Sequence, residues 1–375
     1  MARELSEMDV EVIIHNVNPG LATNSMHETE LQVVADDDLN DYFRWVHSRR
    51  LSTLNVTYLL PVDQEETKRS ERYHRLIQFV FNGRNYVGPA KIALQFGQQR
   101  RSEDIAHVQQ IDIVQLTSPL NQKVLDLGTG SGAWAIDIAE EFPRAEVIGI
   151  DIAPIQPRDV PPNCTQVLTS SFCFYVFEFT RSSRFELCDL DQWHIPYPDA
   201  HFDFIHARSL HIGIHNYPRL LHELARLLRP GGLVLLVEPT LYPCQAPPSY
   251  PPLTGWETFW DTYRRCLRQQ HIDVTVPERL PDLLEATRSF ENIMSQKGNI
   301  PVGFWPNDLD LLTLGQLQWM DYDSLLPALR PLFLSSGIPP SRVEQLIKDA
   351  QHDLYYPTFP LTTTVNITYG SKRFT

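Results

Sequence analysis

Cysteine is scarce in this sequence, and its spacing excludes two common kinds of cross-link. The 375 residues include five cysteines at wide intervals: Cys164, Cys173, Cys188, Cys244 and Cys266. The odd count argues against a full disulfide framework, and the lack of any Cys-x-x-Cys pair argues against a structural zinc site. A reducing compartment, either the cytoplasm or the nucleus, fits this use of cysteine best.

Long apolar runs are also missing. The most apolar windows, Leu233–Val237 and Phe172–Phe179, are far shorter than the roughly 20 residues that a membrane helix needs. Met1–Asn18 places charges within every apolar stretch, which is not the pattern of a signal peptide. We therefore expect neither a membrane segment nor secretion.

Positive charge is in short supply. Lysine and arginine total 32 against 46 acidic residues, so the net charge is −14. A chain this acidic gains nothing from counterion release, so we expect no direct binding to nucleic acid. The basic pairs Arg49-Arg50 and Arg100-Arg101 are too short to be typical of a nuclear signal.

What the sequence does contain is an alternation of strand and helix patterns. Short apolar runs predict strands at Lys123–Leu127, Ala145–Asp151, Phe185–Cys188, Phe202–His206 and Leu233–Val237. Between them, helical spacing covers Ala133–Glu141 and Tyr217–Leu228, and Arg229–Gly232 reads as a turn. This alternation predicts an α/β fold with a doubly wound, mostly parallel sheet and right-handed crossovers.

The flanking regions complete a four-part organisation. We expect a flexible acidic arm at 1–40, which ends in the run Asp36–Asp38, and a mostly helical extension at 41–118. The α/β core follows at 119–242. The remainder, 243–375, is predicted as a helical lid, helical over 255–350, with C-terminal strands that complete the sheet. Among these, Thr362–Tyr369 alternates apolar and polar residues and is placed at a sheet edge.

The most informative motif is the glycine turn Asp126–Gly132, between a predicted strand and a predicted helix. Such a turn lets backbone N–H groups and a helix N-terminus approach a ligand closely. Gly128, Gly130 and Ala133 satisfy the dinucleotide pattern G-x-G-x-x-G/A, and Asp151 follows at the end of the next strand. Taken alone, these residues are compatible with NAD.

Three further features favour S-adenosylmethionine over NAD. Asp126 stands two residues before the first glycine, where its carboxylate would repel a pyrophosphate but attract an ammonium group. Asp189 follows the third predicted strand, where a side-chain oxygen can accept from an adenine amino group. Arg229–Gly232 lies between a helix and the fifth strand.

These motifs resemble those of the Rossmann-like, or class I, methyltransferases. The stretches that carry this resemblance are Val124–Gly132, Ile148–Asp151, Asp189 and Leu228–Gly232. A narrower resemblance, to the fungal LaeA-like methyltransferases, is carried by Trp134–Asp137, Glu146–Asp151, Pro154–Pro157, Val160–Cys164 and Phe202–Arg208. It covers residues 122–240 well and is fainter around Tyr58–Leu76 and Gly303–Gly315. The implied architecture is a seven-stranded sheet with helical N-terminal and lid additions.

The resemblance also implies a set of cofactor-binding residues. They are Asp126, Gly128, Thr129, Gly130, Gly132, Asp151, Ile152, Asp189 and Leu190. The glycines would form the floor under the methionine part of S-adenosylmethionine, with Asp126 near its amino group. Asp151 would hold the ribose hydroxyls and Ile152 would lie against the adenine. Asp189 would face the adenine amino group beside Leu190, although Asp191 is an equally placed acid.

Methyl transfer needs alignment above all, and a base only where the nucleophile carries a proton. The candidates after the fourth predicted strand are His206, Arg208, His211 and His215, of which His206 is the one selected as catalytic. Each histidine also has a purely structural interpretation. His211 and His215 have an i, i+4 spacing that suits a metal, but no third ligand is identifiable, so no metal is expected.

Thr165–Ser183 departs from the family pattern. This aromatic, nearly uncharged and β-prone stretch separates Cys164 from Arg184, which relatives join almost directly. One hypothesis is a translated intron; the rival is a real insertion, such as a hairpin or a substrate lid. A dominant transcript that reads through these codons would contradict the first hypothesis.

Four functions remain open at this point. The first is methyl transfer to a small metabolite, for which a lid carrying Trp256, Phe259, Trp260 and Tyr263 would make an apolar pocket; at their helical spacing the same side chains also read as a core stripe. The LaeA-like resemblance permits a second, a regulator of secondary metabolism acting through velvet-type protein partners. The others are a cofactor-binding module without transfer activity and, more distantly, a dinucleotide oxidoreductase.

Overall fold

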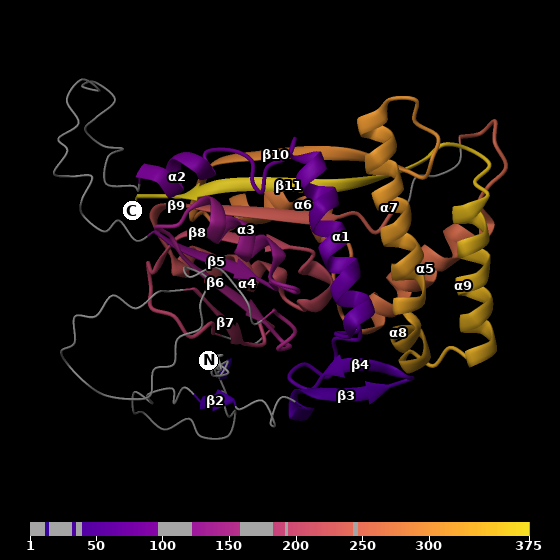
Figure 1. Cartoon of the computed structure of the whole chain (residues 1–375), viewed down its shortest axis with the longest axis horizontal. Coiled ribbons are helices and arrows are strands. Elements are labelled where there is room, and N and C mark those ends of the chain that lie inside the picture. The colour runs from indigo at the N-terminus through magenta and orange to yellow at the C-terminus, as the bar shows by residue number, and fades with distance from the viewer. Residues whose placement is uncertain are drawn as a thin grey trace, which may run out of the picture.

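The chain folds around one large central sheet, whose strands lie one below another in Figure 1 with a layer of helices in front of them. The computed structural model describes residues 12–14, 32–34, 40–96, 122–157, 183–191, 194–242 and 247–374. Most of the predicted arm, including Asp36–Asp38, and residues 165–182 of the atypical stretch lie outside the described residues. The predicted domain boundaries therefore stay predictions.

Seven strands form the body of the sheet. They are β5 (Lys123–Leu127), β6 (Glu146–Asp151), β7 (Ser183–Leu187), β8 (Phe202–Arg208), β9 (Leu228–Pro239), β10 (Phe290–Val302) and β11 (Leu361–Lys372). Their order is β10-β11-β9-β8-β5-β6-β7, and the short strands β1 (Val12–Ile14) and β2 (Gln32–Val34) continue it beyond β7. Strands β5 to β9 pair in parallel, whereas β11 is antiparallel to both of its neighbours. The predicted fold class is confirmed.

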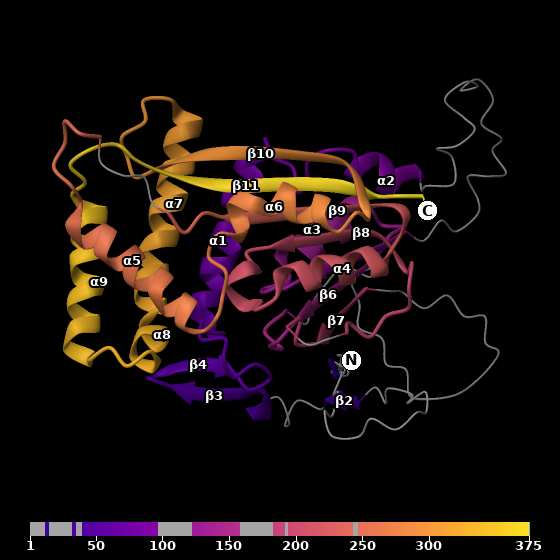
Figure 2. The ribbon, with the colours of Figure 1, turned by 180° about the vertical axis from the view of Figure 1, so that it is seen from behind.

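Helices cover both faces of the sheet because successive residues of each buried strand point to opposite sides. Leu125 and Leu127 of β5 pack on one face with α4 (Tyr217–Leu227) and α6 (Val276–Ala286). Val124 faces the other side, where it packs with α1 (Gln64–Val80), α2 (Ala90–Phe96) and α3 (Ala133–Glu141). Figure 1 shows the layer with α1, α2 and α3, and Figure 2 shows α4 and α6 from behind.

A helical cap lies beside the sheet, at the right of Figure 1. It consists of α5 (Thr254–Gln269), α7 (Leu309–Ala328), α8 (Arg330–Ser335) and α9 (Pro340–Tyr355), which share a separate apolar core. Helices α5 and α9 cross so closely at Gly255 that an added Cβ would lie 2.6 Å from the backbone of Asp349. The predicted lid is therefore a packed unit with its own core.

The region predicted as mostly helical at 41–118 begins instead with a β-hairpin. Strands β3 (Phe43–Val46) and β4 (Arg49–Ser52) flank a two-residue turn, His47-Ser48, in which both residues have positive φ, 48° and 65°. Asparagine and glycine are the residues that usually mark such a turn, so its sequence signal is weak. The Ser52 hydroxyl donates to the Ile152 carbonyl at 2.6 Å and attaches the hairpin to the end of β6.

Two predictions in the C-terminal half are also wrong. Residues Phe290–Val302, expected to be helical, form strand β10 at the sheet edge. The predicted strand Thr362–Tyr369 exists, as part of β11, but it lies between β9 and β10 and not at an edge. Both errors follow from the failure to predict β10, because β11 would lie at the edge of the sheet only if β10 did not exist.

The predicted turn Arg229–Gly232 lies within strand β9. Between the pairs Phe202–Leu228 and Phe204–Leu233 the register shifts, so the motif forms a bulge, with Gly231 at φ 75°. A bulge keeps the chain inside the sheet while it changes direction. No helix in the described ranges is long and apolar enough to span a membrane.

Candidate functional site

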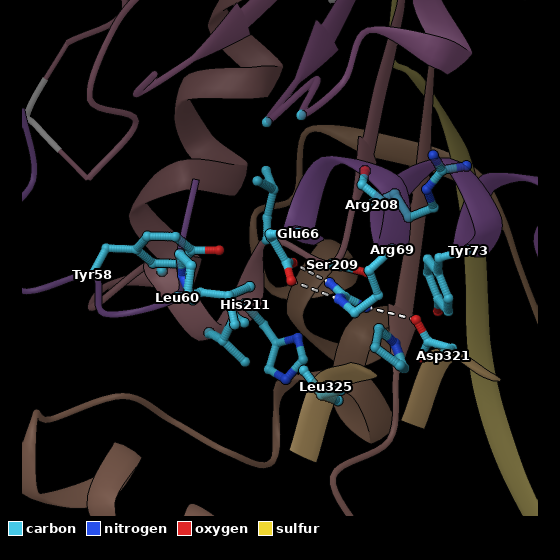
Figure 3. A pocket seen from close by; sticks show the side chains of 18 of the residues that line it. Tyr58, Leu60, Glu66, Arg69, Tyr73, Arg208, Ser209, His211, Asp321 and Leu325 are labelled. Carbon is cyan, nitrogen blue, oxygen red and sulfur yellow. Dashed lines mark hydrogen bonds and ion pairs between the residues drawn. The ribbon is translucent and has the colours of Figure 1, made fainter. Parts of the chain in front are cut away.

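A cavity of about 210 Å³ lies where the parallel strands end and the helical cap begins. Its walls include the segments that follow β5, β6, β7, β8 and β9, together with parts of α1, α5 and α7. Figure 3 shows side chains from these elements facing one another across it. The carboxyl ends of parallel strands are where open α/β sheets bind their ligands.

The glycine turn forms one wall of this cavity. Gly128, Gly130 and Gly132 all have positive φ, 64°, 56° and 81°, a conformation that favours glycine. Gly128, Thr129 and Gly130 line the cavity. Gly132 does not; an added Cβ there would lie 2.6 Å from the Phe185 ring, so its lack of a side chain serves packing between β7 and α3.

The turn also packs closely against its neighbours. A Cβ on Gly130 would lie 3.0 Å from the Ser70 hydroxyl of α1, and one on Gly128 would lie 2.3 Å from Leu210, which follows β8. Side chains at these positions would collide with these neighbours, so the close approach of α1 and Leu210 to the turn requires glycine.

Asp151 ends strand β6 on the cavity wall, with Ile152 beside it. Its carboxylate accepts hydrogen bonds from the Gly130 N–H at 2.8 Å and the Ala153 N–H at 3.2 Å. Burial raises the pKa of Asp151 to about 6, against the lowering effect of these N–H groups. A ligand hydroxyl that donates to this carboxylate would offset part of its desolvation.

Asp189 and Leu190 follow β7 and also line the cavity. Asp189 accepts from the Asn55 side-chain amide at 3.1 Å and from the Asp191 N–H at 3.0 Å, and burial raises its pKa. Asp191 does not line the cavity and pairs with His215 at 2.5 Å. Of the two acids that the sequence left open, the geometry favours Asp189 as the one that faces a ligand.

Asp126 lies behind the turn and not on the cavity wall. It is 2% exposed and accepts from the Thr129 hydroxyl at 2.7 Å, while its second oxygen lies 2.7 Å from Nδ1 of His206. The register of β5 and β8 makes Asp126 and His206 direct neighbours. Its predicted contact with the cofactor amino group therefore has no direct route here, because the buried carboxylate does not reach the cavity wall.

His206, the residue selected as catalytic, does not reach the cavity either. Its ring stacks on Trp134 with 3.9 Å between centroids, and it is 1% exposed. Burial lowers the pKa of His206, and the bond to Asp126 only partly opposes this effect. The structure brings His206 together with Asp126 and Thr129 as a support beneath the glycine turn.

His211, one of the candidate bases that also had a purely structural interpretation, is buried on the cavity wall. It lies in the short 3-10 helix His211–Gly213, and its Nδ1 is 2.7 Å from Oε2 of Glu238, at the end of β9. Both side chains are 1% exposed or less. Only the position of each residue just after a strand could have pointed to this pair, since 27 residues separate them.

A buried ion cluster on α1 and α7 is a second feature that sequence reasoning missed. Arg69 donates to both oxygens of Glu66, at 2.9 and 2.5 Å, and to Asp321 at 2.7 Å, as Figure 3 shows. Burial raises the pKa of both acids and opposes the charge on Arg69, which the two carboxylates nevertheless hold well above its usual pKa. The i, i+3 spacing of Glu66 and Arg69 could have been noticed; Asp321 could not.

The aromatic stripe of α5 serves both of the roles that its spacing allows. Trp256, Phe259, Trp260 and Tyr263 are all buried in the core of the cap. Trp260 and Tyr263 also line the cavity, and so does Tyr322 of α7. The Trp260 indole N–H is buried without a hydrogen-bond partner in the part of the chain that the structure describes. The cavity thus has an apolar, aromatic side opposite the glycine turn.

The described residues hold no cluster of three or more side chains that could bind a metal ion. The spacing of His211 and His215 does not make one, because each pairs with a different carboxylate, Glu238 and Asp191. The two cysteines within the described ranges, Cys188 and Cys266, are free and buried.

The sheet order, the glycine turn after β5 and the carboxylates after β6 and β7 together define a Rossmann-like methyltransferase. A comparison with family models agrees, since a methyltransferase domain model matches residues 69–293. The chain belongs to this methyltransferase domain family. Membership confirms the predicted class of enzyme and, with it, the predicted cofactor, S-adenosylmethionine.

Two curated fungal relatives have different names. The chain is 29% identical over 316 residues to the secondary metabolism regulator laeA of Coprinopsis cinerea; the match covers 80% of this chain and 66% of that protein. It is 25% identical over 292 residues to the methyltransferase pytC of Aspergillus terreus, covering 75% of this chain and 72% of the relative. The LaeA-like resemblance is thereby confirmed.

Solved structures were also compared. The phosphoethanolamine N-methyltransferase 2 of Haemonchus contortus, solved with S-adenosylhomocysteine, is 14% identical, with a TM-score of 0.39; the match covers 86% of this chain and 62% of that one. The YcgJ protein of Bacillus subtilis is 18% identical, with the same TM-score; the match covers 68% of this chain and 93% of that one.

Proposed function

We propose that this protein transfers a methyl group from S-adenosylmethionine to a small metabolite held inside the cavity. The observation that carries the proposal is the continuity of that cavity. The glycine turn, Asp151 and Asp189 share it with Trp260, Tyr263 and Tyr322 of the cap. Cofactor and acceptor groups would therefore meet in one space, as in-line transfer requires.

The chemistry of the residues on the wall supports binding of S-adenosylmethionine. The bare backbone of Gly128, Thr129 and Gly130 would lie under the methionine part. Asp151 would accept from the ribose hydroxyls with Ile152 against the adenine, and Asp189 beside Leu190 would accept from the adenine amino group. When bound, the cofactor supplies an electrophilic methyl group on a sulfonium. Asp126 and Gly132 act from behind, by holding the turn in shape.

Binding of the cofactor is tested by calorimetry with S-adenosylmethionine and with NADH. We expect S-adenosylmethionine alone to bind, and Asp151→Ala to abolish that binding, because the variant removes the acceptor for the ribose. Asp282→Ala, an exposed acid on α6, is the control and should bind normally. NADH binding in place of S-adenosylmethionine would show the dinucleotide assignment to be right, and a folded protein that binds neither would leave the turn a structural feature only.

A regulatory role is the second candidate, favoured by the relative named as a regulator of secondary metabolism. Phe304, Trp319 and Tyr355 form a chain of ring contacts at 5.5 and 5.2 Å on the cap, with Phe304 62% exposed. Such a group is a candidate for contact with a protein partner. A regulator should co-purify with that partner and turn over no small acceptor; a module without activity should bind cofactor and never form S-adenosylhomocysteine. We place the protein in the cytoplasm or the nucleus.

A further inference from the structure

His211 and Glu238 form a buried, hydrogen-bonded pair. Glu238 uses one oxygen to accept from the Leu210 N–H at 3.0 Å and the Tyr217 hydroxyl at 3.1 Å; the other faces Nδ1 of His211 at 2.7 Å. The tautomer in which Nδ1 donates to Glu238 matches this network of acceptor contacts, and in that tautomer Nε2 holds a free lone pair.

That second nitrogen is buried and makes no hydrogen bond to any described residue. Buried polar atoms are nearly always paired, because leaving one unsatisfied costs about 1–3 kcal/mol. His211 is also one of the side chains that line the cavity (Figure 3). An unpaired acceptor on the wall of a ligand cavity is explained if the ligand brings the missing donor.

The backbone holds this acceptor close to the cofactor side of the cavity. Leu210, the residue before His211, lies directly over Gly128 of the glycine turn. Ser209 has a positive φ of 57°, unusual for a residue with a side chain, and its N–H donates to the Val237 carbonyl at 3.0 Å. Strain of this kind persists where the surroundings impose it, commonly at functional sites.

Other bases on the cavity wall are already engaged. Arg69 neutralises Glu66 and pairs with Asp321, while Asp151 accepts from the backbone of the turn. His206 is stacked beneath the turn, away from the cavity. Among the described histidines, His211 is the one on the wall.

We propose that His211 is the general base of the reaction and that the acceptor is an aromatic molecule methylated on a phenolic hydroxyl. Glu238 is a positioning residue that fixes the imidazole tautomer and stabilises the imidazolium. This inference rests on the proposed function and names its substrate class. The aromatic side chains of Trp260, Tyr263 and Tyr322 suit a flat ring. A phenol, with a pKa near 10 like that of tyrosine, keeps its proton at neutral pH and needs a base.

With a phenol, proton removal and methyl transfer occur together. The hydroxyl proton passes to Nε2 of His211 while an oxygen lone pair forms the bond to the methyl carbon. The bond from that carbon to the sulfonium sulfur breaks, and its electron pair stays on sulfur. The products are the methyl ether, neutral S-adenosylhomocysteine and an imidazolium paired with Glu238, which then releases its proton to water.

Two matched probes test the assignment, 2-naphthol and 2-naphthalenethiol, which share a ring system. A thiol loses its proton more readily than a phenol does, so its methylation depends less on a base. We expect the wild type to form S-adenosylhomocysteine with both. His211→Asn should slow 2-naphthol methylation by about 100- to 10,000-fold and leave the thiol rate near wild type. Glu238→Gln, which keeps a hydrogen-bond acceptor but no charge, should be affected in the same direction but less. His215→Asn removes a histidine paired with a carboxylate away from the cavity and is the control.

A solvent isotope effect supplies a second readout, because the phenol proton is in transfer during the proposed step. Methylation of 2-naphthol by the wild type should be slower in D2O than in water, whereas methylation of the thiol should be nearly the same in both. Equal loss of phenol and thiol methylation in His211→Asn, no turnover of 2-naphthol by the wild type, or an equal rate of 2-naphthol methylation in D2O and water would each overturn the assignment. Titration with S-adenosylmethionine distinguishes failure of this inference from failure of the proposed function, because a wild type that binds no cofactor refutes the proposed function itself.

Discussion

Histidines 206 and 211 lie five residues apart, yet they have opposite surroundings. His206 points into the sheet layer, where it stacks on Trp134 and meets Asp126. His211 comes after the strand has ended and lies on the cavity wall. Alternation along a strand predicts that His206 and Arg208 share a face, but it does not predict that Trp134 covers that face at His206. That fact depends on packing between α3 and β8, which sequence spacing does not contain.

Acid should destabilise the protein through its buried histidines. Burial is the main reason that the pKa values of His206 and His74 are lowered, so both are neutral in the fold. Their stabilising contribution is present above the ordinary imidazole pKa of about 6.5 and is lost as the pH falls below it. Urea unfolding at pH 7.5 and at pH 5.5 measures the effect.

His206→Phe keeps a ring against Trp134 but removes the hydrogen bond to Asp126. It should lower the free energy of unfolding by about 1–3 kcal/mol at pH 7.5 and reduce the loss at low pH. His222→Asn, an exposed position on α4, is the control and should change neither. Equal acid sensitivity in His206→Phe and the wild type would contradict a role for His206.

The Asp151 carboxylate should lower the free energy of unfolding while it strengthens cofactor binding. Its pKa is raised from 3.8 to about 6, mainly by burial, so the folded state holds this proton more tightly than the unfolded chain. The carboxyl therefore weakens the fold progressively as the pH rises from about 4 to about 6, and the whole cost is present above that range. Asp151→Asn should raise the free energy of unfolding at pH 7.5 by up to about 3 kcal/mol. Solvent in the cavity screens the carboxylate charge and makes this gain smaller.

The same substitution should weaken binding of S-adenosylmethionine, because the amide accepts poorly where the carboxylate would hold two ribose hydroxyls. Unfolding and calorimetry on one preparation measure both effects. Asp282→Asn should alter neither quantity. A variant that is less stable than the wild type at pH 7.5 would show that the hydrogen bonds to Gly130 and Ala153 outweigh burial.

At the scale of elements, the sequence predicted best where burial is continuous. Strands β5, β6 and β8 are buried over nearly their whole length, and the predicted limits of β5 and α3 coincide with the observed ones. Strand β10 was missed because it lies at the edge and mixes exposed polar residues, Gln296 and Lys297 among them, with few buried ones. The hairpin β3–β4 was missed because its turn has no glycine or asparagine. Sequence patterns within one segment therefore predict poorly those strands that are only partly buried.

The ion cluster on α1 and α7 should be essential to the contact between these helices. Arg69→Met leaves the buried carboxylates of Glu66 and Asp321 without their counter-charge, so the free energy of unfolding should fall by about 3–5 kcal/mol at pH 7.5. Acidification to pH 5 should recover part of this loss, because burial already raises the pKa of both acids. Urea titrations at the two pH values provide the measurement.

Lys68→Met changes an exposed cation one residue away and is the matched control. It should be nearly neutral at both pH values. The triple variant Glu66→Gln, Arg69→Met, Asp321→Asn removes all the charges together and should regain most of the stability. An Arg69→Met protein as stable as the wild type would mean that water reaches the two acids and compensates them.

At the scale of the whole molecule, cofactor binding should stabilise distant parts of the chain together. The cavity draws its walls from α1, the glycine turn, the ends of β6 to β9, and the cap helices α5 and α7. S-adenosylhomocysteine at a hundred times its Kd should add about 2.7 kcal/mol to the free energy of unfolding. Hydrogen exchange should slow in α1 and α7 as well as in the turn; protection confined to residues 126–152 would contradict a shared cavity.

The overall topology was predictable, whereas the composition of the cavity was not. The alternation of strands and helices indicates a doubly wound sheet, and the glycine turn marks one wall. Glu66, His211 and Asp321 line the cavity from three separate elements, and the position of Asp321 beside α1 depends on how the cap packs against that helix. No pattern within one segment carries that information.

The position of β11 has a consequence for the order in which the protein is made. Residues 361–372 pair with β9 on one side and β10 on the other, so until they have been synthesised those two strands have no neighbour between them. A nascent chain on the ribosome can assemble β5 to β9 as they emerge, but one edge of that sheet stays open and β10 has nothing to pair with. Exposed edges invite pairing with other chains. Chaperones that shelter unpaired strands should therefore matter most for this protein in the interval between translation of β9 and release of β11.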